Sequence, residues 1–304
     1  MKVNLEVKIG NLNLKNPIIL ASGTVGYGDE ISEFISLKKI GAIVTKSISL
    51  KPRVGNPPKR IVETASGMLN AIGLANIGLE RFVKEKIPLL EKSKATVICN
   101  IAASSFDEYA TCVKELSPIE TIKAFEINVS CPNVKDGGLI FGNDINAVRK
   151  ITALLRPITE KPLIIKLSPN VANITDFALA VKEEGGNAVS AINTLVGTAF
   201  DIYSRRPKLK NVTGGLSGPA IKPIALAKVL EISRSVEIPI IGIGGISTWE
   251  DAVEFMIAGA SAVQIGTANF INPKVSTEIL EGIKNYCEKK GIKKISELTA
   301  SYRI

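Results

Sequence analysis

The segment FEINVSCPNVKDGG, residues 125–138, begins as a buried β-strand and ends in polar side chains. Its first residues run apolar or alternate, which is typical of a strand that other elements cover. Within six positions there follow two amides, a hydroxyl and a thiol, contributed by Asn128, Ser130, Cys131 and Asn133. A strand with this ending predicts a site at its carboxyl end.

Similar apolar segments recur along the chain, and amphipathic helices are predicted between them. The predicted strands are PIILAS (17–22), AIVTKS (42–47), TVICNI (96–101), FEINVS (125–130), LIIKLS (163–168), AVSAIN (188–193), PIIGIGG (239–245) and AVQIGT (262–267). The predicted helices include residues 106–116, 145–156, 175–184, 220–233, 248–258 and 275–289. Parallel strands between helical layers are apolar in this near-continuous way.

Strand–helix units repeated eight times predict an α/β fold, a (β/α)8 or TIM barrel, formed by residues 1–304 as a single domain. VNLEVKIG (3–10) and LNLKNPI (12–18) alternate with period two about a polar turn, which predicts an N-terminal β-hairpin. The alternative is an open doubly wound sheet, but no GxGxxG motif opens a helix after the first strand.

The composition excludes several classes of protein. The four cysteines lack CxxC spacing and the chain has no histidine, which argues against a zinc site and favours a cytoplasmic protein without disulfides. The N-terminus lacks the apolar region of a signal peptide, and no apolar run reaches the ~18 residues of a membrane span. The net charge is +9 but aromatic residues are only 5 %, so we expect attraction for small anions rather than nucleic-acid binding.

In a TIM barrel the active site forms at the carboxyl ends of the strands. Here those ends carry polar residues or glycines, namely Ser22, Lys46, Ser47, Asn100, Asn128, Cys131, Lys166, Ser168, Asn193, Thr194, Gly244, Gly245, Gly266 and Thr267. Isolated polar residues in apolar strands are costly to bury without partners. Their gathering on one rim therefore predicts a shared ligand site.

The two lysines define the expected ligand. Glu126 is the one carboxylate on a strand end, and we expect it to face away from the neighbours of Asn128, so that an anionic ligand neutralises Lys46 and Lys166. The glycines that end the last two strands predict a phosphate site, and the amides suit a flat heterocycle. This combination favours FMN with a small anionic substrate. The alternatives are a phosphate-binding aldolase barrel with a Schiff base on either lysine, and a non-catalytic flavin-storing barrel.

Cys131 differs from Cys99, Cys112 and Cys287, which are predicted to be buried, inert thiols. It follows its strand in a loop that also contains Lys135. A thiol has a pKa of roughly 8.5, which neighbouring cations lower. Because the chain has no histidine to activate a nucleophile, we expect Cys131 to act as a general base toward a carbon acid.

The whole chain resembles the class 1B dihydroorotate dehydrogenase family, in its catalytic subunit. The motifs are ASGTVGYG (21–28), GNPPKRIVETASGMLNAIGLAN (55–76), NVSCPNVKDGG (128–138), INTLVGTAFDI (192–202), GGLSGPAIKPIAL (214–226) and IGIGGISTWEDAVEFMIAGASAVQIGTA (241–268). The resemblance implies an FMN-containing barrel that oxidises dihydroorotate to orotate in pyrimidine synthesis. It departs slightly at Val25, where a larger aromatic residue is expected, and at LANIG (74–78), which replaces a proline-bearing turn.

The resemblance also implies residue roles. The implied FMN-binding residues are Ser22, Lys46, Ser47, Asn100, Asn128, Lys166, Ile192, Gly218, Gly244, Gly245, Gly266 and Thr267. The implied substrate-binding residues are Lys46, Asn70, Ala71, Ile72, Gly73, Leu74, Asn128, Asn193 and Thr194. Cys131 falls on the catalytic base, and Lys166 falls where positive charge stabilises the reduced flavin.

Partners follow from the class. The resemblance to class 1B implies a heterotetramer, in which a homodimeric core binds a second subunit. That subunit carries FAD and a [2Fe–2S] cluster and passes electrons to NAD. Since this chain has no cysteine cluster for an iron–sulfur centre, we expect that cluster on the partner. The alternative is a class 1A-type homodimer that uses fumarate. No long amphipathic N-terminal extension precedes the barrel, which argues against the membrane-bound class that uses quinones.

Overall fold

The structure, a computed structural model, describes residues 3–130, 132–133 and 139–303. Parallel strands close into a barrel in the order β11–β12–β17–β18–β3–β4–β7–β8. The barrel strands are β3 (Ile18–Leu20), β4 (Ala42–Val44), β7 (Val97–Ile101), β8 (Ile122–Asn128), β11 (Leu163–Lys166), β12 (Ala188–Ala191), β17 (Ile240–Ile243) and β18 (Ala262–Ile265). The predicted barrel and its strands are confirmed. Most of these strands end a little earlier than predicted, because their last residues leave the ladder and enter the loops around the carboxyl end, or mouth, of the barrel.

Helices surround the barrel. They are α1 (Gly78–Arg81), α2 (Ile87–Ser93), α3 (Phe106–Leu116), α4 (Ile145–Leu155), α5 (Ile174–Glu183), α6 (Lys222–Ser235), α7 (Trp249–Ile257), α8 (Ala268–Ile271) and α9 (Val275–Lys290). The π-helical η2 (Phe82–Lys86) joins α1 to α2, and the 3-10 turns are η1 (Leu37–Lys39), η3 (Phe141–Asn143), η4 (Arg156–Ile158), η5 (Pro219–Ile221) and η6 (Ile295–Leu298). Side-chain caps from Ser105, Asp144, Asn173 and Thr248 begin α3, α4, α5 and α7. These caps satisfy free N–H groups of the first turn and fix where each helix begins.

The predicted N-terminal hairpin is confirmed as β1 (Val7–Ile9) paired antiparallel with β2 (Leu12–Leu14). Both strands bury alternate residues, as their period-two pattern predicts. In the part of the chain that the structure describes, no helix is long and apolar enough to cross a membrane.

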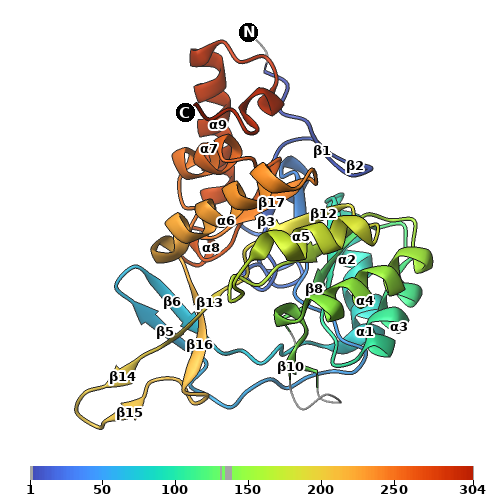
Figure 1. Cartoon of the computed structure of the whole chain (residues 1–304), viewed down its shortest axis with the longest axis vertical. Coiled ribbons are helices and arrows are strands. Elements are labelled where there is room, and N and C mark those ends of the chain that lie inside the picture. The colour runs from blue at the N-terminus through green and yellow to red at the C-terminus, as the bar shows by residue number, and fades with distance from the viewer. Residues whose placement is uncertain (1–2, 131, 134–138, 304) are drawn as a thin grey trace.

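A second, antiparallel sheet was not predicted from the sequence. Its strands lie in the order β13 (Leu195–Thr198), β16 (Thr213–Ser217), β6 (Gly67–Asn70) and β5 (Ile61–Thr64). These strands lie in the loops after β4 and β12, so the sheet projects from the carboxyl side of the barrel, and the ribbon β14 (Phe200–Asp201) and β15 (Arg206–Pro207) forms its outer tip (Figure 1). A further short pair, β9 (Pro132–Asn133) and β10 (Leu139–Ile140), follows β8.

Candidate functional site

The parallel register of the barrel brings the predicted site residues to one mouth. Lys166 lies opposite Asn128 in the ladder between β11 and β8, and Asn100 lies opposite Glu126 in the ladder between β7 and β8. All four side chains are buried. The remaining predicted residues of the barrel follow their strands directly and face the same end, namely Ser22, Lys46, Ser47, Ile192, Asn193, Thr194, Gly244, Gly245, Gly266 and Thr267.

Glu126 is the centre of this site, and the expectation that it faces away was wrong. Its carboxylate is fully buried inside the barrel and lies 3.5 Å from the Nζ atom of Lys166. It also accepts hydrogen bonds from Asn100 Nδ2 (2.7 Å), Ser190 Oγ (2.9 Å) and Gln264 Nε2 (2.6 Å). Residues two apart in a strand point to the same face, so Glu126 shares the interior with Asn128. Lys166 therefore has a protein partner for its charge.

The other lysine is different. Among the described residues, no carboxylate lies within salt-bridge distance of the half-buried Lys46. Its neighbour Ser47 donates a hydrogen bond from Oγ to Asn100 Oδ1 over 2.6 Å. This bond and the one to Glu126 fix both ends of the Asn100 amide. Lys46 is thus, within the described part of this mouth, a cation that suits an anionic ligand.

A second network lies at the ends of β8 and β12. Asn193 Nδ2 donates to Asn128 Oδ1 (3.2 Å) and to Ser130 Oγ (2.8 Å), while Asn193 Oδ1 accepts from the N–H of Thr194 (2.8 Å). The hydroxyl of Tyr109 donates to the carbonyl oxygen of Asn128 over 2.7 Å. The amides are therefore held in fixed orientations, as recognition of a flat polar ring requires.

The second sheet brings distant residues to this mouth. Asn70 Nδ2 donates to the carbonyl oxygen of Gly215 over 3.2 Å. A Cβ atom at Gly215 would lie 2.1 Å from Thr194 Oγ1, so Asn70 and Thr194 both border the same glycine. Residues 71–74 continue from Asn70 as a partly exposed loop. The structure thus places Asn70 and Thr194 next to the same residue, although the role of both as ligands stays a prediction.

Gly244 and Gly245 form a closely packed corner with Gly218. Gly244 and Gly245 have φ angles of +134° and +72°, which favour glycine. A Cβ at Gly245 would lie 2.9 Å from the carbonyl oxygen of Gly218. In the described part of the chain, the N–H groups of Gly245, Gly266 and Thr267 have no hydrogen-bond acceptor. Free backbone donors at the ends of the last two strands suit the phosphate group that the sequence predicts here.

Alanine at Gly244 should destabilise the protein by about 2 kcal/mol, because its φ angle is strained for other residues and its Cβ would lie 2.6 Å from Ala225 Cβ. Gly266→Ala is the matched control. Its Cβ would meet Ala21 and Thr24 only at 3.6 and 3.9 Å, so stability should stay within about 0.5 kcal/mol. Urea unfolding measures both variants, and equal losses would contradict the structure of this corner.

Lys222, which borders Gly245, carries an ion-pair network behind the corner. Its Nζ atom lies 2.7 Å from Asp251 Oδ1, and Asp251 Oδ2 accepts from the N–H groups of Ser247 (2.8 Å) and Thr248 (3.0 Å). Burial raises the pKa of Asp251, but the Lys222 ammonium and these two N–H groups outweigh it and hold that pKa below its ordinary value. The network completes the capping box of α7.

Asp251→Asn should lower the free energy of unfolding by about 1 kcal/mol at neutral pH. A carboxyl whose pKa is lower in the folded state stabilises that state fully above its unfolded pKa of roughly 3.9. That stabilisation is lost as the pH falls through the lower folded value. Urea unfolding of both proteins should therefore show stabilities that converge below about pH 4. A difference that persists unchanged in acid would exclude the charge as its cause.

Cys131 lies outside the described residues, so its predicted role as the base stays a prediction. The cysteines predicted to be inert, Cys99, Cys112 and Cys287, are all buried. Burial raises the pKa of Cys99 and of Cys112 to about 12. These two thiols therefore stay protonated at neutral pH and cannot serve as bases.

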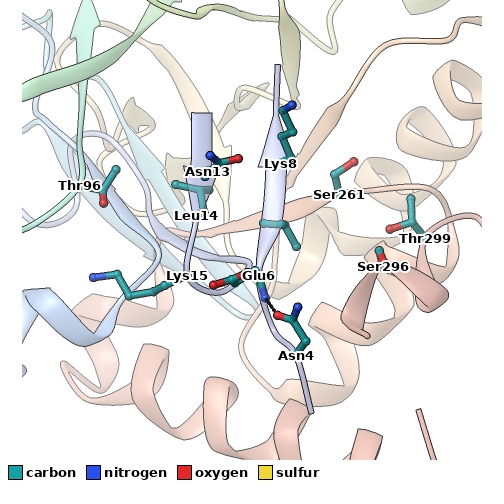
Figure 2. Close-up of a pocket in the computed structure, with 11 residues that line it drawn as sticks. Asn4, Glu6, Lys8, Asn13, Leu14, Lys15, Thr96, Ser261, Ser296 and Thr299 are labelled. Atoms are coloured by element: carbon teal, nitrogen blue, oxygen red, sulfur yellow. Dashed lines mark hydrogen bonds between the residues drawn. The ribbon is translucent and has the colours of Figure 1, made fainter. Parts of the chain in front are cut away.

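An open cavity of about 830 Å³ lies at the opposite end of the barrel. Thr96 and Ser261, which directly precede β7 and β18, line it together with the β1–β2 hairpin. Figure 2 shows the polar groups of Lys8, Ser261 and Thr299 around it. None of the predicted site residues that the structure describes borders this cavity.

Comparisons with known proteins agree with the resemblance of the motifs. A family model described as dihydroorotate dehydrogenase matches residues 4–287. A relative named "Dihydroorotate dehydrogenase B (NAD(+)), catalytic subunit" from Trichlorobacter lovleyi is 52% identical over 298 residues, which cover 98% of each chain. Proteins of the same name from Geotalea uraniireducens and Geobacter sulfurreducens are each 50% identical, over 98% and 100% of this chain and 97% and 99% of their own lengths.

Proposed function

The chain belongs to the dihydroorotate dehydrogenase family, and on that premise we propose that it is an NAD-linked enzyme that oxidises dihydroorotate to orotate in pyrimidine biosynthesis, with FMN as its cofactor. The observation that carries this proposal is that Lys166 and Asn100 both contact the buried carboxylate of Glu126, at the mouth that also has free backbone N–H donors. Such a mouth suits a ligand that has both a phosphate and a polar ring.

The residues present fit FMN. The glycine corner and Thr267 offer backbone donors for the phosphate, and a Cβ atom at Gly266 would have described neighbours only at 3.6 and 3.9 Å. The FMN site would comprise Ser22, Lys46, Ser47, Asn100, Asn128, Lys166, Ile192, Gly218, Gly244, Gly245, Gly266 and Thr267. When bound, FMN supplies the acceptor for the hydride that leaves carbon 6 of dihydroorotate.

The protein's own groups bind the substrate and move the proton. The thiolate of Cys131 removes the proton from carbon 5, and Lys46 attracts the anionic substrate. Amides and backbone groups of Asn70, Ala71, Ile72, Gly73, Leu74, Asn128, Asn193 and Thr194 orient the pyrimidine and its carboxylate. The fixed amides of Asn128 and Asn193 support this assignment, because a pre-oriented site loses less entropy on binding.

The name "catalytic subunit" of the relatives supports a partner chain. We propose a homodimer core joined by a subunit that carries FAD and a [2Fe–2S] cluster, in a cytoplasmic heterotetramer that reduces NAD. The four cysteines of this chain do not form the close run that such a cluster needs, which supports placing it on the partner.

Anaerobic titration of the purified chain with dihydroorotate tests the proposal. The bound flavin should bleach near ~450 nm and recover on addition of NAD only when the partner subunit is present. Recovery with fumarate in the absence of the partner would indicate the class 1A-type reaction instead. A flavin that stays oxidised would refute the dehydrogenase, and borohydride trapping of a carbonyl substrate on a lysine would indicate an aldolase.

A further inference from the structure

We propose that Glu126 is a positioning residue of the flavin site, which holds Lys166 and Asn100 in place and, through Lys166, lowers the reduction potential of the bound flavin. The inference rests on the proposed function, because it requires FMN at this mouth. It assigns a role to a residue that is not among those expected to bind the substrate or the cofactor.

The contacts of Glu126 come from four other strands of the barrel. Asn100 of β7 and Lys166 of β11 approach Oε1, at 2.7 and 3.5 Å, while Ser190 of β12 and Gln264 of β18 donate to Oε2. Every one of these partners is a donor, so the group acts here as a carboxylate that only accepts. A single side chain thus sets the positions of two expected flavin ligands.

Glu126 lies deeper in the barrel than Lys166. The side chain of Glu126 has no exposed surface, whereas that of Lys166 is 10% exposed. In the ladder, Lys166 pairs with Asn128, two residues closer to the carboxyl end of β8 than Glu126. Lys166 therefore lies on the mouth side of Glu126, and the negative charge lies behind the positive one. Apolar replacements of a buried ion pair are often as stable as the pair, so stability alone does not explain its presence.

The charge behind Lys166 has a consequence for redox chemistry. A cation beside a flavin favours its reduced form, which carries more negative charge, and this raises the reduction potential. The Glu126 carboxylate offsets part of that positive field, because the two charges are only 3.5 Å apart in a buried site. The pair thus gives an oriented donor with a moderated charge.

Glu126→Gln tests the inference in the FMN-loaded protein. It keeps the size of the side chain and removes its charge, so the midpoint potential of the bound flavin should rise. We expect the equilibrium constant for flavin reduction to increase about tenfold, which is ~30 mV for a two-electron couple. In a Lys166→Met background the same substitution should have a clearly smaller effect, because only the direct field of the carboxylate remains to be removed and its hold on the Lys166 ammonium is already gone.

The outcomes separate positioning from a merely structural role. A Glu126→Gln protein that binds less FMN but keeps the parental potential would overturn the inference. A shift that persists in full in the Lys166→Met background would also overturn it. Loss of FMN binding by the parent would overturn both this inference and the proposed function. A parent that binds FMN but is not reduced by dihydroorotate would overturn only the function, since the potentials are compared with chemical reductants.

Ser190→Ala decides the matter if Glu126→Gln does not fold. It removes one donor from Glu126 Oε2 and keeps both charges of the pair. The carboxylate then offsets Lys166 more strongly, so the potential should fall, opposite in sign to the effect of Glu126→Gln. A parental potential in Ser190→Ala would contradict the inference.

Discussion

Replacing Cys131 with alanine should slow the reduction of bound FMN by dihydroorotate by at least ~10²-fold, while FMN stays bound. A positioned general base accelerates proton transfer by about 10²–10⁴-fold. The chain has no histidine, and the thiols of Cys99 and Cys112 are buried with raised pKa values, so neither can replace Cys131. Rapid mixing under anaerobic conditions, followed by flavin absorbance, measures this rate.

Cys112→Ala is the matched control for that experiment. It removes a thiol that is buried in the hydrophobic core and takes no part in the site. We expect lower stability, because the substitution leaves a small cavity, and a parental rate of flavin reduction. If the Cys131 variant is reduced at the parental rate, another group is the base.

The barrel was predictable because its strands are apolar on both faces. Strands such as LIIK in β11 and AVSA in β12 are buried at every position, so the sequence pattern and the burial coincide. The polar residues that follow each strand then identify the carboxyl end of the barrel as the candidate site. Eight such units favour a barrel over an open sheet, and the structure confirms that the strands close.

The role of Glu126 was missed although the signal for it was present. Period two in β8 places Glu126 and Asn128 on the same face, and the ladder places Asn100 beside Glu126. The prediction treated both lysines as partners of a ligand. What the sequence alone could not show was the distance between Glu126 and Lys166, because it depends on how neighbouring strands are staggered.

The second sheet was missed for a different physical reason. Strands β6 and β16, with sequences GMLN and TGGLS, are short and rich in glycine, which has low β-propensity. They form a sheet because segments about 145 residues apart pair with each other, as Asn70 and Gly215 do. Local sequence patterns do not predict such long-range pairing, although this pairing places Asn70 at the mouth.

Lys166→Met should lower the free energy of unfolding of the FMN-free protein by about 3 kcal/mol and weaken FMN binding. The substitution leaves the Glu126 carboxylate buried without its counter-charge. Three neutral hydrogen-bond donors still contact it, so the expected loss of stability is at the lower end of the range that is typical when one partner of a buried ion pair is removed. Lys46→Met is the matched control, a lysine at the same mouth that has no carboxylate partner among the described residues. Its stability should stay within about 0.5 kcal/mol of the parent, since no buried charge loses its partner. Urea unfolding compares the two variants, and equal stabilities would mean that the contact between Glu126 and Lys166 contributes nothing to the fold.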